Sequence, residues 1–187
     1  MTTTLFTNAH IATGEPGSTA ASTLPLQDIL VTDGVFTAFG PGLAQQYEAQ
    51  GGDLAAIEVV DLGGKLVCPP FCDTHLHLDY VFTARKPGAV NESGTLFEGI
   101  QRWSETKSDL TVDEIKQRAK IGIKKEMLHG VQLIRSHADV TDPNLTSLKA
   151  LLELKEELKD TVTLQIVSFP QEGMYSYEGP HGESGEI

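Results

Sequence analysis

The sequence predicts an α/β protein in which a β-rich opening segment precedes alternating strands and helices. From residue 66 onward, short continuous apolar runs alternate with helical patterns, which is typical of βα units and a parallel sheet. Before residue 66, the apolar runs all have strand character. We therefore expect an N-terminal β portion at residues 1–65 and a βα portion at residues 66–187.

The N-terminal portion contains a small set of expected strands. The segments Thr3–Ala12 and Ile29–Phe39 are rich in β-branched and apolar residues. Asp33 and Gly34 interrupt the second segment, and an Asp-Gly pair between two such runs is a strong hairpin signal. Residues 55–61 predict one more short strand. A sheet this thin is poorly able to stand by itself.

The βα portion begins with an expected buried strand from Leu66 to His77. A helix is predicted at Thr95–Trp103, and its core side consists of four residues: Leu96, Phe97, Ile100 and Trp103. A second helix begins at Thr111, because Thr111 and Glu114 have the spacing of a capping box. Gly130 is expected to end this helix.

Two further strands and one helix complete the pattern. An apolar strand starts at Val131 and runs into the polar residues that end at Asp139. Asp142 and Pro143 are expected to open the next helix as its N-cap and first residue. Its buried face is predicted to consist of Leu145, Leu148, Leu152 and Leu158. A third apolar strand follows at Val162–Phe169.

Each of these three strands ends in residues that can do chemistry. The groups are Asp73, His75 and His77, then His137 and Asp139, then Gln171 and Glu172. In α/β folds, functional groups gather at the carboxyl ends of the parallel strands. Three consecutive strands that end this way are a stronger signal than any one of them.

The pair His75 and His77 is the most specific of these features. Residues i and i+2 of a strand point to the same side, so both imidazoles can aim at one point. Imidazole is the commonest protein ligand for metal ions. The sequence therefore predicts that His75 and His77 bind a metal ion.

Composition excludes several classes of partner. The 187 residues carry a formal net charge of −12, which argues against nucleic acid or an anionic membrane surface as a partner. The N-terminus has no secretory signal, so we expect a cytoplasmic protein. The two cysteines, Cys68 and Cys72, are not a disulfide framework, and we expect them to be buried thiols.

Several motifs together resemble the amidohydrolase superfamily, and more closely its bacterial-type cytosine deaminases. They are the His75/His77 pair and the runs Ser93–Ile100, Arg135–Val140 and Leu164–Gly173. The resemblance covers about residues 60–177. It implies a fold in which strands of a small β-sandwich (residues 1–65) precede the first three βα units of a (β/α)8 barrel (residues 66–187).

The resemblance also implies a function. It implies hydrolytic deamination of cytosine to uracil and ammonia, by water activated on one divalent iron or zinc ion that His75 and His77 help to bind. The family's substrate-binding positions correspond to Gln171 and Leu96. His137 and Asp139 are expected to support the metal site or the pocket, or else to bind loop backbone. We expect a homo-oligomer, with a small pyrimidine as substrate.

The resemblance places the remaining metal ligands and the general acid/base on later strands, beyond Ile187. We therefore expect no catalytic residue among residues 1–187, and no activity of this chain alone. Two alternatives stay open. One is a related amidohydrolase that acts on another ring amine, such as a triazine. The other is a truncated, non-catalytic module.

Overall fold

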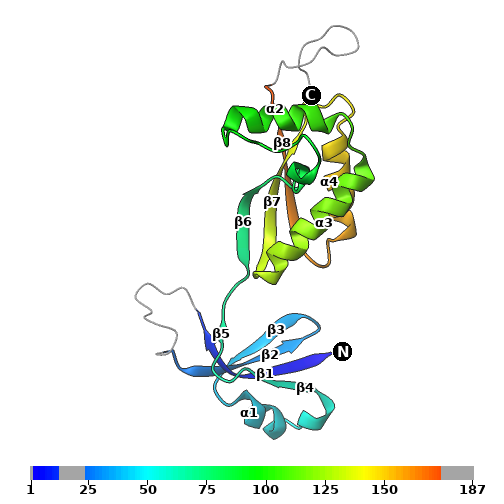
Figure 1. Ribbon diagram of the computed structural model, residues 1–187. Helices are drawn as coiled ribbons and strands as arrows, with labels where there is room; N and C mark the ends of the chain where they lie inside the picture. The colour runs from blue at the N-terminus through cyan, green and yellow to red at the C-terminus, as the bar shows by residue number, and fades with distance from the viewer. Residues whose placement is uncertain (1, 13–23, 174–187) are drawn as a thin grey trace. The chain divides into compact units, whose positions relative to one another are not determined.

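A computed structural model describes residues 2–12 and 24–173 of the chain (Figure 1). The chain divides into two compact units between Pro69 and Pro70. Residues 13–23, which precede β2, and the C-terminal residues up to Ile187 lie outside the described part. The expectation that the general acid/base follows Ile187 therefore lies outside the described residues too and stays a prediction. Among the described residues, no helix is both long and apolar enough to cross a membrane.

The first unit is built around one five-stranded sheet. Its strands are β1 (Thr3–Ile11), β2 (Leu26–Thr32), β3 (Val35–Gly40), β4 (Glu58–Asp61) and β5 (Leu66–Val67). The order is β3-β2-β1-β4, with β5 also paired to β1. The predicted hairpin is confirmed, since Thr32 pairs with Val35 and the intervening Asp33 and Gly34 have φ values of 49° and 79°.

The first unit also departs from the all-β expectation. It contains the helix α1 (Leu43–Ala49) and the short 3-10 helix η2 (Leu54–Ala56). The Asp53 side chain accepts a hydrogen bond from the Ala55 N–H, so this turn forms where we expected a strand to begin. The strand itself starts only at Glu58.

The single strand expected from Leu66 to His77 is also wrong, because the structure has two strands there. Leu66–Val67 pairs with β1 in the first unit, and β6 (Phe71–Leu76) opens the second unit. Pro69 and Pro70 separate them, since proline lacks the N–H that a strand ladder requires.

The second unit is a parallel three-stranded sheet covered by helices. Its elements are β6, the short 3-10 helix η3 (Thr83–Arg85), α2 (Leu96–Lys107), α3 (Val112–Leu128), β7 (Val131–Asp139), α4 (Thr146–Glu157) and β8 (Thr163–Phe169). The sheet order is β6-β7-β8, with both pairs parallel. This succession confirms the predicted α/β class and fits the first units of a (β/α)8 barrel.

The core of the second unit lies between the helices and one face of the sheet. On β7, Ile134 and Ala138 are fully buried on the helix side, while Leu133 on the opposite face is 40% exposed. Each buried aliphatic side chain stabilises the fold by about 1.5–3 kcal/mol. The predicted capping box of α3 is present, and Ile115, Ala119 and Ile123, which are spaced four residues apart on this helix, are buried.

Several expectations about the second unit are corrected. Helix α4 begins at Thr146 rather than Asp142, because the Asp142 carboxylate accepts hydrogen bonds from the N–H groups of Asn144 and Thr146 in a turn. The fully buried residues of α4 are Ser147, Ala150, Leu151 and Leu154. Of the predicted face, Leu148 and Leu158 pack partly buried against the core, whereas Leu152 is 50% exposed.

Helix α2 continues to Lys107, and its buried residue is Trp103. Leu96 and Phe97 are 73% and 83% exposed, because they lie in the first turn of α2, directly after the loop that precedes this helix. The cysteines are exposed rather than buried. Cys72 lies on β6, an edge strand that nothing in the described residues covers.

Candidate active site

The carboxyl ends of β6, β7 and β8 bring the predicted site residues to one edge of the parallel sheet. His75 and His77 lie at the end of β6, and His137 and Asp139 lie at the end of β7. Gln171 follows β8 in a turn, where its N–H donates to the Phe169 carbonyl at 2.9 Å. Parallel strands present their carboxyl ends together, so the sheet topology alone assembles these groups.

The two histidines of β6 converge on one point. Their Nε2 atoms are 3.3 Å apart. Two nitrogens bound to one tetrahedral zinc at about 2.05 Å would be about 3.3–3.4 Å apart, so the pair has the separation of two metal ligands. An irregularity in the β6–β7 register between Asp73 and Leu76 accompanies this arrangement. The Asp73 carboxylate accepts from the His75 N–H at 2.9 Å and fixes the local backbone.

The tautomer of His77 is set by its other nitrogen. Nδ1 lies 2.9 Å from the His137 carbonyl oxygen, which only accepts, so Nδ1 carries the proton and Nε2 keeps its lone pair. Burial lowers the pKa of His77, which favours the neutral ring that a metal ion requires. The pair therefore fits two positions of a divalent metal site. Within the described residues, no group of three His, Cys, Asp or Glu side chains forms such a site.

His137 contributes its carbonyl to His77 and its ring to His75. The rings of His75 and His137 stack with centroids 4.0 Å apart and an interplanar angle of 18°. The His137 Nδ1 atom is buried without a hydrogen-bond partner among the described residues. His137 therefore helps to orient both histidines of β6. Its own ring nitrogens do not converge with their Nε2 atoms on a common point.

A cavity of about 390 Å³ lies against Tyr80, which follows β6, and Gln171, which follows β8, and we call it the strand-end cavity. Its lining residues are Tyr80, Asn91, Gly94, Thr95, Leu96, Gly99, Ile100, Trp103 and Gln171. Both residues expected to bind substrate, Leu96 and Gln171, line it. Among residues 2–12 and 24–173, the side-chain amide of Gln171 forms no hydrogen bond, and this side chain lines the cavity.

Aromatic rings connect the strand-end cavity to the histidines. The Tyr80 ring stacks on His77 with centroids 4.6 Å apart, and it packs against Trp103 at 4.7 Å. Burial raises the pKa of the Tyr80 hydroxyl, so this group stays protonated. A ligand in the cavity would therefore contact Tyr80, whose ring stacks on His77.

Asp139 supports the wall of this cavity rather than the histidine rings. Its side chain is 1% exposed, and its Oδ2 accepts from Trp103 Nε1 at 2.6 Å and Lys107 Nζ at 3.2 Å. Its Oδ1 accepts from the N–H and hydroxyl of Thr141. The Asp139 N–H donates to the fully buried Asp79, and burial raises the pKa of Asp79 to about 6.

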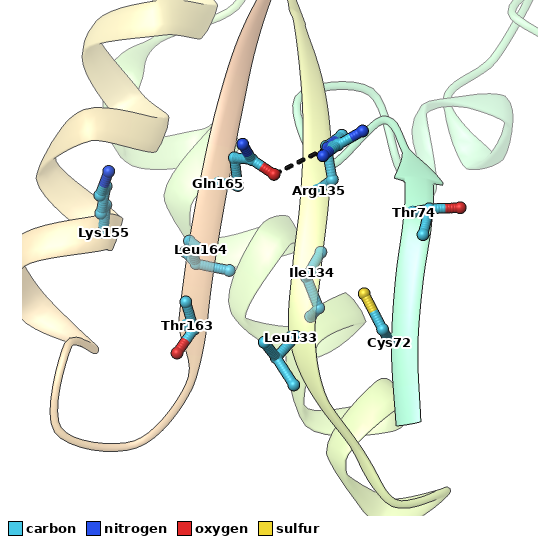
Figure 2. Close-up of a pocket in the computed structure, with 9 residues that line it drawn as sticks. All are labelled: Cys72, Thr74, Leu133, Ile134, Arg135, Lys155, Thr163, Leu164 and Gln165. Carbon is cyan, nitrogen blue, oxygen red and sulfur yellow. Dashed lines mark hydrogen bonds between the residues drawn. The ribbon is translucent and has the colours of Figure 1, made fainter. Parts of the chain in front are cut away.

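A second cavity, of about 370 Å³, lies over the amino-terminal halves of the three strands, and we call it the strand-face cavity. Figure 2 shows its lining residues, which are Cys72, Thr74, Leu133, Ile134, Arg135, Lys155, Thr163, Leu164 and Gln165. The Arg135 Nε donates to Gln165 Oε1 at 2.7 Å across neighbouring strands (Figure 2). No histidine is among these lining residues.

Three residues of the site were not predicted from sequence, namely Tyr80, Trp103 and Lys107. Trp103 was expected only as a core residue, and its hydrogen bond to Asp139 spans 36 residues. Tyr80 falls in a segment that reads as a loop. For Lys107, the available signal was its position one turn after Trp103 on the same helix, but its partners lie 32 to 65 residues away.

A parallel βα sheet with paired histidines at its carboxyl edge is the arrangement expected of the amidohydrolase class. Comparison with known proteins supports this assignment. The model of the Amidohydrolase family matches residues 58–186, so the chain belongs to this family. The predicted resemblance is confirmed at this level.

Individual relatives are deaminases and an amidohydrolase. The solved 5-methylcytosine deaminase from Klebsiella pneumoniae, liganded with 5-fluorocytosine, is 40% identical with a TM-score of 0.75, over 95% of this chain and 38% of its own. N-isopropylammelide isopropyl amidohydrolase of Pseudomonas sp. (strain ADP) is 35% identical over 62% of this chain and 30% of its own length. Pterin deaminase of Rhizobium rhizogenes is 27% identical over 79% of this chain and 32% of its own length. The chain thus spans about a third of the length of these relatives.

Proposed function

We propose that this chain supplies the first two metal ligands and the ring-binding cavity of a metal-dependent deaminase that acts on cytosine. One observation carries the proposal. The strand-end cavity contains both Leu96 and Gln171 and lies against Tyr80, whose ring stacks on His77. A ring-binding surface and a metal-binding pair thus occupy one edge of the sheet.

The metal would be held by His75 and His77 through their Nε2 atoms, and we propose zinc or iron. A bound divalent ion would supply the hydrolytic nucleophile, because it lowers the pKa of water to about 7. The chain's own part is to keep both Nε2 lone pairs available. The His137 carbonyl does this for His77 by holding its proton on Nδ1. The general acid/base stays assigned to the strands expected after Ile187.

Ring recognition is assigned to Gln171. A side-chain amide donates and accepts at once, which matches the adjacent carbonyl and N–H of a pyrimidine edge. The volume of about 390 Å³ lies at the small end of the 300–1,000 Å³ range of ligand pockets, which suits a single ring. Tyr80 and Trp103 provide an apolar wall that keeps water from this side of the ring.

Two candidates compete for the identity of the ring, a cytosine-type ring and a triazine. The 40% identity with the 5-methylcytosine deaminase favours a cytosine-type ring. The 35% identity with the N-isopropylammelide amidohydrolase favours a triazine. The Gln171 amide can donate and accept, so it accommodates either ring edge.

Isothermal titration calorimetry of the 187-residue chain tests this proposal. The ligands are cytosine, 5-methylcytosine, ammelide and pterin, each with and without zinc. We expect cytosine or 5-methylcytosine to bind most tightly. Tightest binding of ammelide would establish the triazine alternative, and binding of none of the four would overturn the proposal.

We also propose that the enzyme works in the cytoplasm as a homo-oligomer, without nucleic-acid or membrane partners. The net charge of −12 supports the absence of polyanionic partners. The exposed side chains of Val35, Phe36 and Phe39 on the first unit's sheet support self-association. Light scattering coupled to size exclusion tests this, and a strictly monomeric species would contradict it.

A further inference from the structure

The ammonium group of Lys107 makes contacts that the proposed binding roles do not explain. Its Nζ donates to Asp139 Oδ2 at 3.2 Å, to Thr141 Oγ1 at 2.7 Å and to Glu172 Oε1 at 2.6 Å. The Lys107 side chain is only 12% exposed. Because an ammonium group has three protons, these three acceptors use its whole capacity.

The three acceptors lie on two segments that are distant in sequence from Lys107 and from each other. Asp139 ends β7, Thr141 follows it, and Glu172 lies in the turn after β8. Lys107 itself is the last residue of α2, the helix that carries Leu96 and Trp103 into the strand-end cavity. A single side chain therefore joins the helix wall of the cavity to the ends of two strands.

The contact with Glu172 matters most, because Glu172 is the neighbour of Gln171. The turn that holds both residues contains hydrogen bonds from the Gln171 N–H to the Phe169 carbonyl and from the Gly173 N–H to the Pro170 carbonyl. Lys107 fixes this turn from one side, while the Gln171 side chain lines the cavity. The same ammonium group shares Asp139 Oδ2 with Trp103 Nε1 and so also fixes the part of the wall that Trp103 forms.

We propose that Lys107 is a positioning residue for ring recognition. It acts on Gln171 through Glu172 and on Trp103 through Asp139, so that the amide and the aromatic wall keep a constant separation. This inference rests on the proposed function, since it assigns a role to the geometry of that cavity. Without Lys107, Gln171 would sample several positions, and a ring ligand would have to order it on binding.

Lys116 provides a matched control. It also forms a partly buried ion pair, with its Nζ 2.8 Å from Glu153 Oε2 and its side chain 20% exposed. That pair joins α3 to α4 and touches no residue of the strand-end cavity. A general loss of stability would affect Lys107→Met and Lys116→Met alike, whereas loss of positioning would affect only the former.

The test compares Lys107→Met, Glu172→Gln and Lys116→Met in the 187-residue chain. The first measurement is the NMR order parameter of the Gln171 backbone N–H, which needs no ligand. The second is the Kd for cytosine, which is measured through the change in fluorescence of Trp103, the only tryptophan of the chain. Glu172→Gln breaks the ion pair but keeps Asp139 paired, so it remains informative if Lys107→Met fails to fold.

We expect the order parameter of Gln171 to fall from about 0.85 toward about 0.6 in Lys107→Met and Glu172→Gln, and to stay unchanged in Lys116→Met. We expect the cytosine Kd to rise about tenfold in the same two variants. An unchanged order parameter would overturn the inference whatever the ligand. A mobile Gln171 with an unchanged Kd would overturn it too. If the unmodified chain binds no cytosine, the proposed ring is wrong, and the order parameter still decides whether Lys107 positions Gln171.

Discussion

Two cavities of the second unit have nearly equal volumes but differ in their surroundings. The strand-end cavity measures about 390 Å³ and the strand-face cavity about 370 Å³. The first adjoins Tyr80, whose ring stacks on His77, and Asp139 supports its wall. The second is lined by side chains from the amino-terminal halves of the strands, where Arg135 and Gln165 form an exposed pair.

The difference shows that position on the sheet is more informative than volume. The carboxyl ends of parallel strands gather loops that can carry polar groups, whereas the middle of a strand offers only alternate side chains on one face. Behind the wall of the strand-end cavity, the Asp139 carboxylate is buried and accepts hydrogen bonds from Trp103, Lys107 and Thr141. Across the strand-face cavity, Arg135 and Gln165 form a single exposed hydrogen-bonded pair. The predictions below test whether these surroundings have the expected energetic consequences.

The largest expected effect concerns stability. Asp139→Ala leaves the Trp103 indole and the Lys107 ammonium without their shared acceptor, so we expect the free energy of unfolding to fall by about 3–5 kcal/mol. Arg135→Ala in the strand-face cavity should cost less than about 1 kcal/mol, because that side chain is exposed. Urea denaturation measures both. Similar losses in the two variants would remove the energetic distinction between the cavities.

The next effect concerns metal binding. Loss of a group that only orients a metal ligand lowers metal affinity about 10–100-fold, so we expect His77→Ala to weaken zinc binding by at least about 100-fold. Cys72→Ser, in the strand-face cavity, should leave zinc affinity unchanged. Competition with a chromophoric chelator gives both affinities. If Cys72→Ser weakened zinc binding and His77→Ala did not, the metal would bind near the amino end of β6. That result would contradict the proposed site at its carboxyl end.

The smallest effect is a pH response confined to the loop at the strand-end cavity. Hydrogen bonds from the Ser93 side chain and from the N–H groups of Ser93 and Glu92 lower the pKa of Glu98 to about 2, from an ordinary value of 4.5. Because the folded pKa is the lower one, the stabilisation is fully present above pH 4.5 and is lost as the pH falls through about 2.

An NMR titration checks this response. The Ser93 amide should shift with a midpoint near pH 2, and Glu98→Gln should abolish the shift. The strand-face cavity has no carboxylate among its lining residues, so the Gln165 amide should not respond. A midpoint near 4.5 for Ser93 would show that the loop does not hold Glu98 as the structure describes.

Much of this arrangement could be predicted from the sequence, because it depends on local patterns. The spacing of His75 and His77, the capping box at Thr111 and the alternation of apolar strands with helices are all readable over a few residues. The parallel topology then brings His137, Asp139 and Gln171 to the same edge without further information.

The remainder depends on contacts between distant segments. The pairing of Lys107 with Glu172 spans 65 residues, and no local pattern marks it. The break at Pro69 and Pro70 differs from the expected single strand, because the apolar residues around the prolines favour a continuous strand while the prolines lack the N–H groups that it requires. The exposure of Cys72 and Leu133 depends on what covers the sheet, and strand patterns contain no information about that.

The central claim is that a ring ligand binds at the strand ends, and the two glutamines allow a direct test. Gln171 lines the strand-end cavity and Gln165 lines the strand-face cavity, so each is a control for the other. The measurement is a cytosine titration of the unmodified chain, Gln171→Ala and Gln165→Ala, with the fluorescence of Trp103 as the signal. The account predicts that Gln171→Ala raises the Kd about tenfold, as expected for loss of one or two hydrogen bonds, and that Gln165→Ala leaves it unchanged. A raised Kd in Gln165→Ala with an unchanged Kd in Gln171→Ala would contradict it.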